Sequence, residues 1–211
     1  MIEKLKYVFV GAHPDDIEIA SGGLVAKLLE NKAIVKFVVI TDGEYVSGTH
    51  TRTKETAIKE QCIVADKYGI DLALLGKKIG NISRGNEIVS ELEKEIYGFD
   101  VVVTHNLNEL HNEHELVSRI TMEAARNVDR VAMWQPYALT SKSGRSISTP
   151  NLYVELTEDQ LAKKIDMIKM HSTEHKRKSC FVEDAEKYAL YNGIFIKSRF
   201  AEGFNIVRWR W

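Results

Sequence analysis

Apolar runs alternate with amphipathic segments along the first 135 residues of the chain. Residues 6–12 (KYVFVGA) and 33–40 (AIVKFVVI) are nearly continuous apolar runs, which are typical of strands buried on both faces. Between them, apolar residues recur about every 3.6 positions, which predicts a helix. Further strands are predicted at residues 72–75, 100–104, 130–134, 152–156 and 200–211. Further helices are predicted at residues 54–67, 87–97, 116–127 and 158–171.

This order of elements predicts the fold class. Strands that alternate with helices favour a mostly parallel sheet with helices on both faces, which is a Rossmann-like α/β fold, here with a C-terminal extension of strand and helix. We find no internal repeat and no linker, so residues 1–211 are expected to form a single domain. The polar segments 47–53 and 137–150 are predicted to be loops. The Gly22-Gly23 pair, inside a predicted helix, indicates close packing against a neighbour or a ligand.

Composition and charge exclude several classes of protein. The 29 basic residues nearly balance the 30 acidic ones, so no broad basic surface points to nucleic acid or to an anionic membrane. The N-terminal apolar run is too short to span a bilayer, and we expect no integral membrane segment. Cys62 and Cys180 are far apart and have no metal-binding spacing, so reduced thiols in a cytoplasmic protein are expected.

Polar side chains gather where predicted strands end. These clusters are His13, Asp15 and Asp16; Asp42 and Glu44; and Glu109, His111, Glu113 and His114. Because right-handed crossovers bring the carboxyl ends of parallel strands to one edge of the sheet, the clusters are able to converge in one pocket.

Two imidazoles and one carboxylate form a ligand set that leaves one position open on zinc, as in a catalytic site. His13 and Asp16 are three positions apart across a turn, and His111 and His114 have the same spacing at the start of a helix. We predict that His13, Asp16 and one of these two histidines hold the metal. The other histidine and Asp15 would then form an acid–base pair beside the bound water.

Simpler interpretations exist for each cluster taken alone. Adjacent aspartates before a helix are usually caps, a lone H-x-x-H often arises by chance, and Glu44 alone suits a solvated loop. Two other functions also stay open: a metal-dependent hydrolase of another amide or ester, and a non-catalytic sugar- or nucleotide-binding module. No G-x-G-x-x-G or P-loop supports nucleotide binding.

Residues 12–18 (AHPDDIE), followed by Gly22-Gly23, resemble the first motif of the LmbE-like, or PIG-L, family of zinc-dependent de-N-acetylases. Residues 109–114 (ELHNEH) are similar to the second motif of the family, D-x-H-x-D-H, with both aspartates replaced by glutamates. Residues 41–44 (TDGE) resemble T-x-G-E, and residues 201–204 (AEGF) resemble AE-x-F. Lys164 and His171 reproduce the family's spacing of a late lysine and histidine.

The resemblance implies a role for each matching residue. His13, Asp16 and His114 would bind one zinc ion per chain, and Asp15 would be the general base. His111 would stabilise the oxyanion and assist proton transfer to the leaving amine, with Glu113 as its orienting partner. Glu44 and Arg52 would contact the substrate.

The implied reaction removes an N-acetyl group from an N-acetylglucosamine-type sugar or sugar conjugate, releasing acetate and a free amine. The partner would therefore be a small N-acetylated molecule. The resemblance also makes a homo-oligomer possible.

Overall fold

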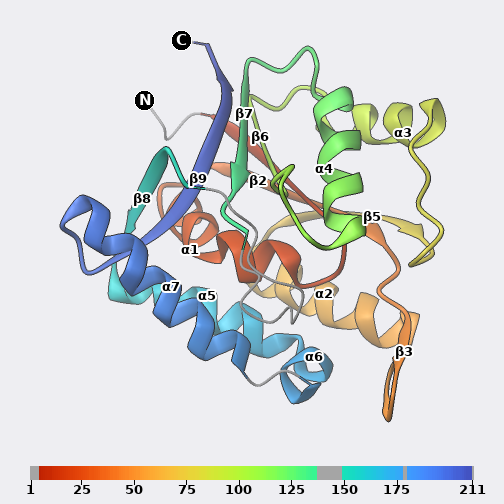
Figure 1. Ribbon diagram of the computed structural model, residues 1–211, viewed down its shortest axis with the longest axis horizontal. Helices are drawn as coiled ribbons and strands as arrows, with labels where there is room; N and C mark the ends of the chain where they lie inside the picture. Colours follow the sequence, from red (N-terminus) through yellow and green to blue (C-terminus); the bar gives the residue numbers. More distant parts are fainter. Residues whose placement is uncertain (1–4, 137–148, 178–179, 211) are drawn as a thin grey trace.

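The computed structural model describes residues 5–136, 149–177 and 180–210, which build a central sheet between helices (Figure 1). In this part of the chain, one sheet has seven strands in the order β5-β2-β1-β6-β7-β9-β8. Their bounds are β1 Lys6–Gly11, β2 Ile34–Thr41, β5 Asp71–Lys77, β6 Val101–Thr104, β7 Arg130–Trp134, β8 Leu152–Leu156 and β9 Phe200–Trp209. The first five strands in this order pair in parallel, and β9 pairs antiparallel with β7 and β8.

The helices cover both faces of the sheet. They are α1 Asp16–Glu30, α2 Lys54–Tyr68, α3 Asn86–Ile96, α4 Asn112–Ala124, α5 Glu158–Met170, α6 Ser172–Arg177 and α7 Cys180–Ile196. One apolar core joins the sheet to α1, α2 and α5, and a second core joins it to α3 and α4. Figure 1 shows α3 and α4 together at the right of the view, and α5, α6 and α7 grouped along its lower edge. The predicted α/β fold is confirmed.

The central strand β1 shows why these residues form a strand with helices on both sides. Successive side chains of a strand point to opposite faces of the sheet. Accordingly, Tyr7 and Phe9 lie in the first core, whereas Val8 and Val10 lie in the second. Because both faces are covered, β1 is an almost unbroken apolar run and not an alternating one.

The structure corrects two details of the predicted elements. Most of the polar segment predicted as a loop, residues 47–53, instead contributes to an antiparallel hairpin of β3 Tyr45–Ser47 and β4 His50–Arg52. The helices α6 and α7, of which α7 packs on β9, had no individual prediction within the C-terminal extension. Of the predicted loop 137–150, residues 137–148 lie outside the described part of the chain.

Close packing at the glycine pair of α1 agrees with the prediction. A Cβ atom added to Gly23 would lie 2.3 Å from Leu156 Cδ1 and 2.9 Å from Glu202 Oε1. The Glu202 carboxylate on β9 accepts hydrogen bonds from the backbone N–H groups of Gly23 and Leu24, at 2.9 and 2.7 Å, and from Lys164 Nζ at 2.5 Å. The absence of a side chain at Gly23 therefore lets β8 and β9 approach α1.

Three further expectations concern the whole chain. Among the described residues, no helix has the length and apolar character needed to cross a membrane. Cys62 is a free thiol. The single domain over residues 1–211 and the cytoplasmic location stay predictions.

Candidate active site

The first and second sequence motifs meet at the carboxyl ends of two neighbouring strands. Strands β1 and β6 pair in parallel, so the segments that follow Gly11 and Thr104 leave the sheet at the same edge. The first segment leads into α1 and the second into α4. Histidines and carboxylates from about a hundred positions apart in the sequence are therefore brought together.

Two imidazole nitrogens and the two carboxylate oxygens of Asp16 lie close together at this edge. His13 Nδ1 and His114 Nε2 are 3.3 Å apart. His13 Nδ1 lies 3.3 Å from Asp16 Oδ2, and His114 Nε2 lies 3.3 Å from Asp16 Oδ1. Tetrahedral zinc, with ligand bonds of about 2.0–2.1 Å, would separate its donor atoms by about 3.3–3.4 Å. The two imidazole nitrogens and the carboxylate thus fit a single divalent cation, and His13, Asp16 and His114 are the candidate ligands.

Asp16 is the centre of this cluster. It is 2% exposed, and its Oδ2 accepts a 2.7 Å hydrogen bond from the backbone N–H of His13. Burial alone would raise the pKa of Asp16, but the imidazoles of His114, His105 and His13 lower it well below its ordinary value. In the metal-free protein this carboxylate is therefore ionised beside His13 and His114, whose pKa values it raises; a bound metal would take the place of their extra protons.

His105 belongs to the cluster, although the sequence motifs did not single it out. It is fully buried, and its Nε2 accepts a 3.0 Å hydrogen bond from the backbone N–H of Ala12 and lies 3.2 Å from Asp16 Oδ2. Its ring stacks on His114 with 4.2 Å between the centroids. One feature of the sequence could have pointed to His105: it directly follows the apolar strand β6, just as the other site residues follow strands.

His111 and Glu113 take different positions beside the candidate metal ligands. The His111 ring is exposed and lies 5.2 Å from the His13 ring and 4.4 Å from the His114 ring, between centroids. Burial and then the neighbouring His114 lower the pKa of His111 to about 4. Glu113 Oε2 lies 2.9 Å from His13 Nε2, and no hydrogen bond joins Glu113 to His111 within the described chain.

Asp15 lies at the start of α1, on the side opposite to Asp16 and its neighbouring histidines. Its φ angle of 113° is in the left-handed region, and its side chain makes no capping hydrogen bond, so the capping interpretation is wrong for this residue. Its Oδ2 is 4.0 Å from Nη1 of Arg52. Burial and then the adjacent Asp16 carboxylate raise the pKa of Asp15, whereas Arg52 lowers it.

The two predicted substrate contacts differ in exposure. Arg52 is 2% exposed, and its guanidinium donates to the Pro14 carbonyl at 3.1 Å and to Glu60 Oε2 at 2.9 Å. Glu44 is exposed just beyond the end of β2, the strand next to β1. In this arrangement Glu44 is accessible from solvent, whereas Arg52 is held behind Asp15 by protein groups.

The lysine and the histidine of the predicted late helix have buried acidic partners. Lys164 pairs with Glu202, whereas His171 Nε2 lies 3.2 Å from Glu18 Oε1. Both acidic groups come from the recognised motifs. These motif residues therefore form buried ion pairs that lie outside the candidate metal site.

Comparisons with known proteins identify the family of the chain. The family described as GlcNAc-PI de-N-acetylase (PIG-L) matches residues 8–125, and the protein belongs to this family. The resemblance drawn from the motifs is thereby confirmed. A search of curated proteins gave no match.

Solved structures share the fold over almost the whole chain. An N,N'-diacetylchitobiose deacetylase from Pyrococcus horikoshii has a TM-score of 0.82 at 20% identity, covering 96% of this chain and 84% of the other. The zinc-inhibited form of the teicoplanin deacetylase Orf2 has a TM-score of 0.76 at 14% identity, covering 96% and 98%. GalB, a 4-carboxy-2-hydroxymuconate hydratase from Pseudomonas putida KT2440, has a TM-score of 0.80 at 17% identity, covering 98% of both chains. Because deacetylases and a hydratase share this fold, the site and not the fold must decide the reaction.

Proposed function

We propose that this protein is a metal-dependent hydrolase that removes the N-acetyl group from an N-acetylglucosamine-type sugar or sugar conjugate. The observation that carries the proposal is the cluster of His13 Nδ1, His114 Nε2 and the Asp16 carboxylate, in which the two nitrogens are 3.3 Å apart and each is 3.3 Å from a different Asp16 oxygen, in a chain of the PIG-L family. The proposed cofactor is one Zn²⁺ per chain. Bound there, zinc would polarise the acetamide carbonyl and lower the pKa of a water molecule.

The residues around this cluster provide the acid–base chemistry. Asp15 takes a proton from the attacking water as the oxygen–carbon bond forms. His111 stabilises the negative charge on the carbonyl oxygen through its ring N–H, and it assists transfer of the proton held by Asp15 to the amine as the carbon–nitrogen bond breaks. Acetate and a free amine result. The exposed ring of His111, next to His13 and His114, suits this role because it is open to a substrate.

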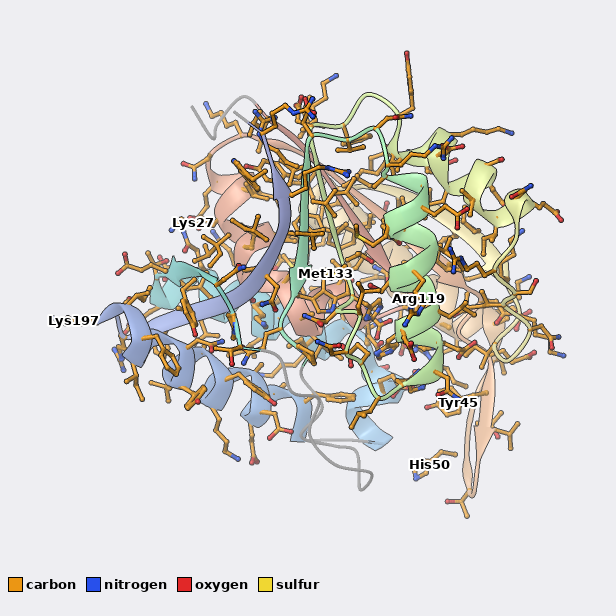
Figure 2. All side chains as sticks on the ribbon, turned by 45° about the horizontal axis from the view of Figure 1, so that its top comes forward. Lys27, Tyr45, His50, Arg119, Met133 and Lys197 are labelled. Carbon is orange, nitrogen blue, oxygen red and sulfur yellow. The ribbon has the colours of Figure 1, made fainter. Side chains whose placement is uncertain are left out.

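A sugar-type substrate is supported by the family and by the surface near the site. The family name, and two structural neighbours that act on diacetylchitobiose and teicoplanin, associate this fold with N-acetylated compounds. Glu44 is exposed, and the hairpin that follows it extends away from the body of the protein, with His50 near its tip (Figure 2). We infer that Glu44 and this hairpin border the sugar-binding surface. A direct substrate contact by Arg52 would need its guanidinium to leave its buried partners.

The test is acetate release from a panel of N-acetylated sugars and conjugates by the zinc-loaded protein. We expect at least one substrate to release acetate, with activity lost on chelation and restored by zinc. Asp15→Asn should reduce kcat by about 10²–10⁴-fold, which is the usual contribution of a general base.

Two results would contradict the proposal. One is acetate release that neither chelation nor Asp15→Asn affects. The other is a bound metal with no amide hydrolysis across the panel, together with hydration of an enol acid followed by its ultraviolet absorbance. Metal analysis that finds two ions per chain would instead favour a hydrolase of another class.

A further inference from the structure

We propose that Glu113 is a positioning residue for the metal ligand His13 and does not act through His111. The inference rests on the proposed metal site and adds to it the contact that fixes one ligand. His13 Nδ1 faces Asp16 and His114, and His13 Nε2 lies 2.9 Å from Glu113 Oε2 on the opposite side of the ring. A cation bound by Nδ1 requires that nitrogen to carry a lone pair, so the ring proton must sit on Nε2. Nε2–H then donates to Glu113.

The Glu113 carboxylate is itself held in place. Its second oxygen, Oε1, accepts a 2.8 Å hydrogen bond from the backbone N–H of Gly80, in the segment between β5 and α3. Glu113 also lies in the first turn of α4, where the helix dipole favours a negative charge. One side chain thereby joins α4, the segment after β5 and the His13 ring, and each oxygen has its own donor.

The length of the side chain is important for this double contact. An aspartate at position 113 is one methylene shorter, so it is unable to reach both His13 Nε2 and Gly80 N unless α4 moves. The glutamate that replaces the aspartate of the family motif therefore has a structural role. His111, which follows the same loop into α4, is exposed and takes no part in these hydrogen bonds.

Zinc affinity, measured by competition with a chromophoric chelator, tests the proposal without depending on a substrate. The variants are E113Q, E113D, H111A and the double variant H111A/E113Q. We expect E113Q and E113D to weaken zinc binding by about 10–100-fold, because removal of a partner of a metal-bound histidine has this effect. H111A should bind zinc within about twofold of the original chain, and E113Q should have the same effect in the H111A background.

The matched control is E115Q. Glu115 also lies in the first turn of α4, but it pairs with Arg119 at the surface, so its removal should leave zinc affinity unchanged. Thermal unfolding of the metal-free variants shows that each is folded. The visible spectrum of the Co²⁺-loaded protein gives a second readout, and its bands should change in E113Q and E113D but not in E115Q.

The proposal is overturned if E113Q binds zinc as tightly as the original chain, or if its only effect is a loss of kcat that disappears in the H111A background. The second pattern would show that Glu113 acts by orienting His111, as the resemblance to the family implies. If the original chain binds zinc and E113Q weakens zinc binding while no substrate is hydrolysed, the proposed deacetylase function is contradicted and the proposed role of Glu113 is supported. If the original chain binds no zinc, both proposals are contradicted.

Discussion

Two clusters of buried charge lie on either side of the start of α1, and they are stabilised in different ways. On one side, Asp16 contacts the imidazoles of His13, His105 and His114. On the other side, Arg52 lies 2.9 Å from Glu60 and within 4.0 Å of Asp15 and Glu174. The second cluster contains its own permanent cation. In the first, neighbouring nitrogen and oxygen atoms of His13, His114 and Asp16 are 3.3 Å apart, which is the spacing of donor atoms around a tetrahedral divalent cation.

The Arg52 cluster also joins elements of the fold. Glu60 on α2 accepts hydrogen bonds from Ser172 Oγ, from the backbone N–H of Thr173 and from Thr173 Oγ1, at 2.7–2.9 Å. Because Arg52 also donates to the carbonyl of Pro14, the hairpin, α2 and α6 are tied to the turn that holds Asp15. The comparison favours a structural role for the Arg52 cluster, and the Asp16 cluster is the one for which we propose a chemical role.

The largest expected effect is the loss of catalysis when a ligand is removed. Asp16→Asn should reduce bound zinc from about one per chain to near zero and lower kcat/KM by about 10³-fold or more, since a metal contributes several kcal/mol to such a reaction. Metal analysis and acetate release measure the two effects. Asp159→Asn, at an exposed site in the first turn of α5, is the control and should change neither. Full zinc occupancy in the Asp16 variant would remove this residue from the ligand set.

Arg52→Met tests the structural cluster. Glu60, Glu174 and Asp15 would lose their shared buried cation, so the free energy of unfolding should fall by about 3–5 kcal/mol. Denaturant titration gives the value. Arg84→Met is the matched control: its partner Glu123 and its own side chain are exposed, so the loss should be about 1 kcal/mol or less. Equal losses in the two variants would show that the buried cluster adds no special stability.

Zinc itself should stabilise the fold only through the first cluster. At a free zinc concentration of about 100 times Kd, the free energy of unfolding should rise by about 2.7 kcal/mol. Thermal unfolding with zinc and with chelator gives this increment. We expect it to persist in Arg52→Met and to disappear in Asp16→Asn. An increment that vanished in both variants would show that the two clusters act as one unit.

Ser172→Ala should have the smallest effect. It removes one of several donors to the Glu60 carboxylate, so the free energy of unfolding should fall by about 0.5–1.5 kcal/mol. Denaturant titration is again the measurement, with zinc affinity as a second readout that should stay unchanged. A loss as large as that of Arg52→Met would mean that the hydrogen bonds, and not the arginine, hold this cluster together.

The sequence alone determined the fold class, the buried strands and the position of the site. These are local properties: an unbroken apolar run predicts a strand covered on both faces, as β1 shows, and polar residues directly after such strands lie at one edge of a parallel sheet, where they are able to converge. The motif around His13 and Asp16 is contained in a few consecutive residues. Its neighbours in the chain were therefore sufficient to recognise it.

Only the tertiary structure decided which groups meet. It placed His114 Nε2 rather than His111 against Asp16, Glu113 on His13, His105 beneath His114, and Arg52 in the buried cluster behind Asp15. The pattern of the sequence also did not reveal the hairpin around β3 and β4. Each of these contacts depends on the direction of a side chain and on the distance between elements far apart in the sequence. Differences of about an ångström, which no spacing in a sequence encodes, separate a ligand from its supporting neighbour.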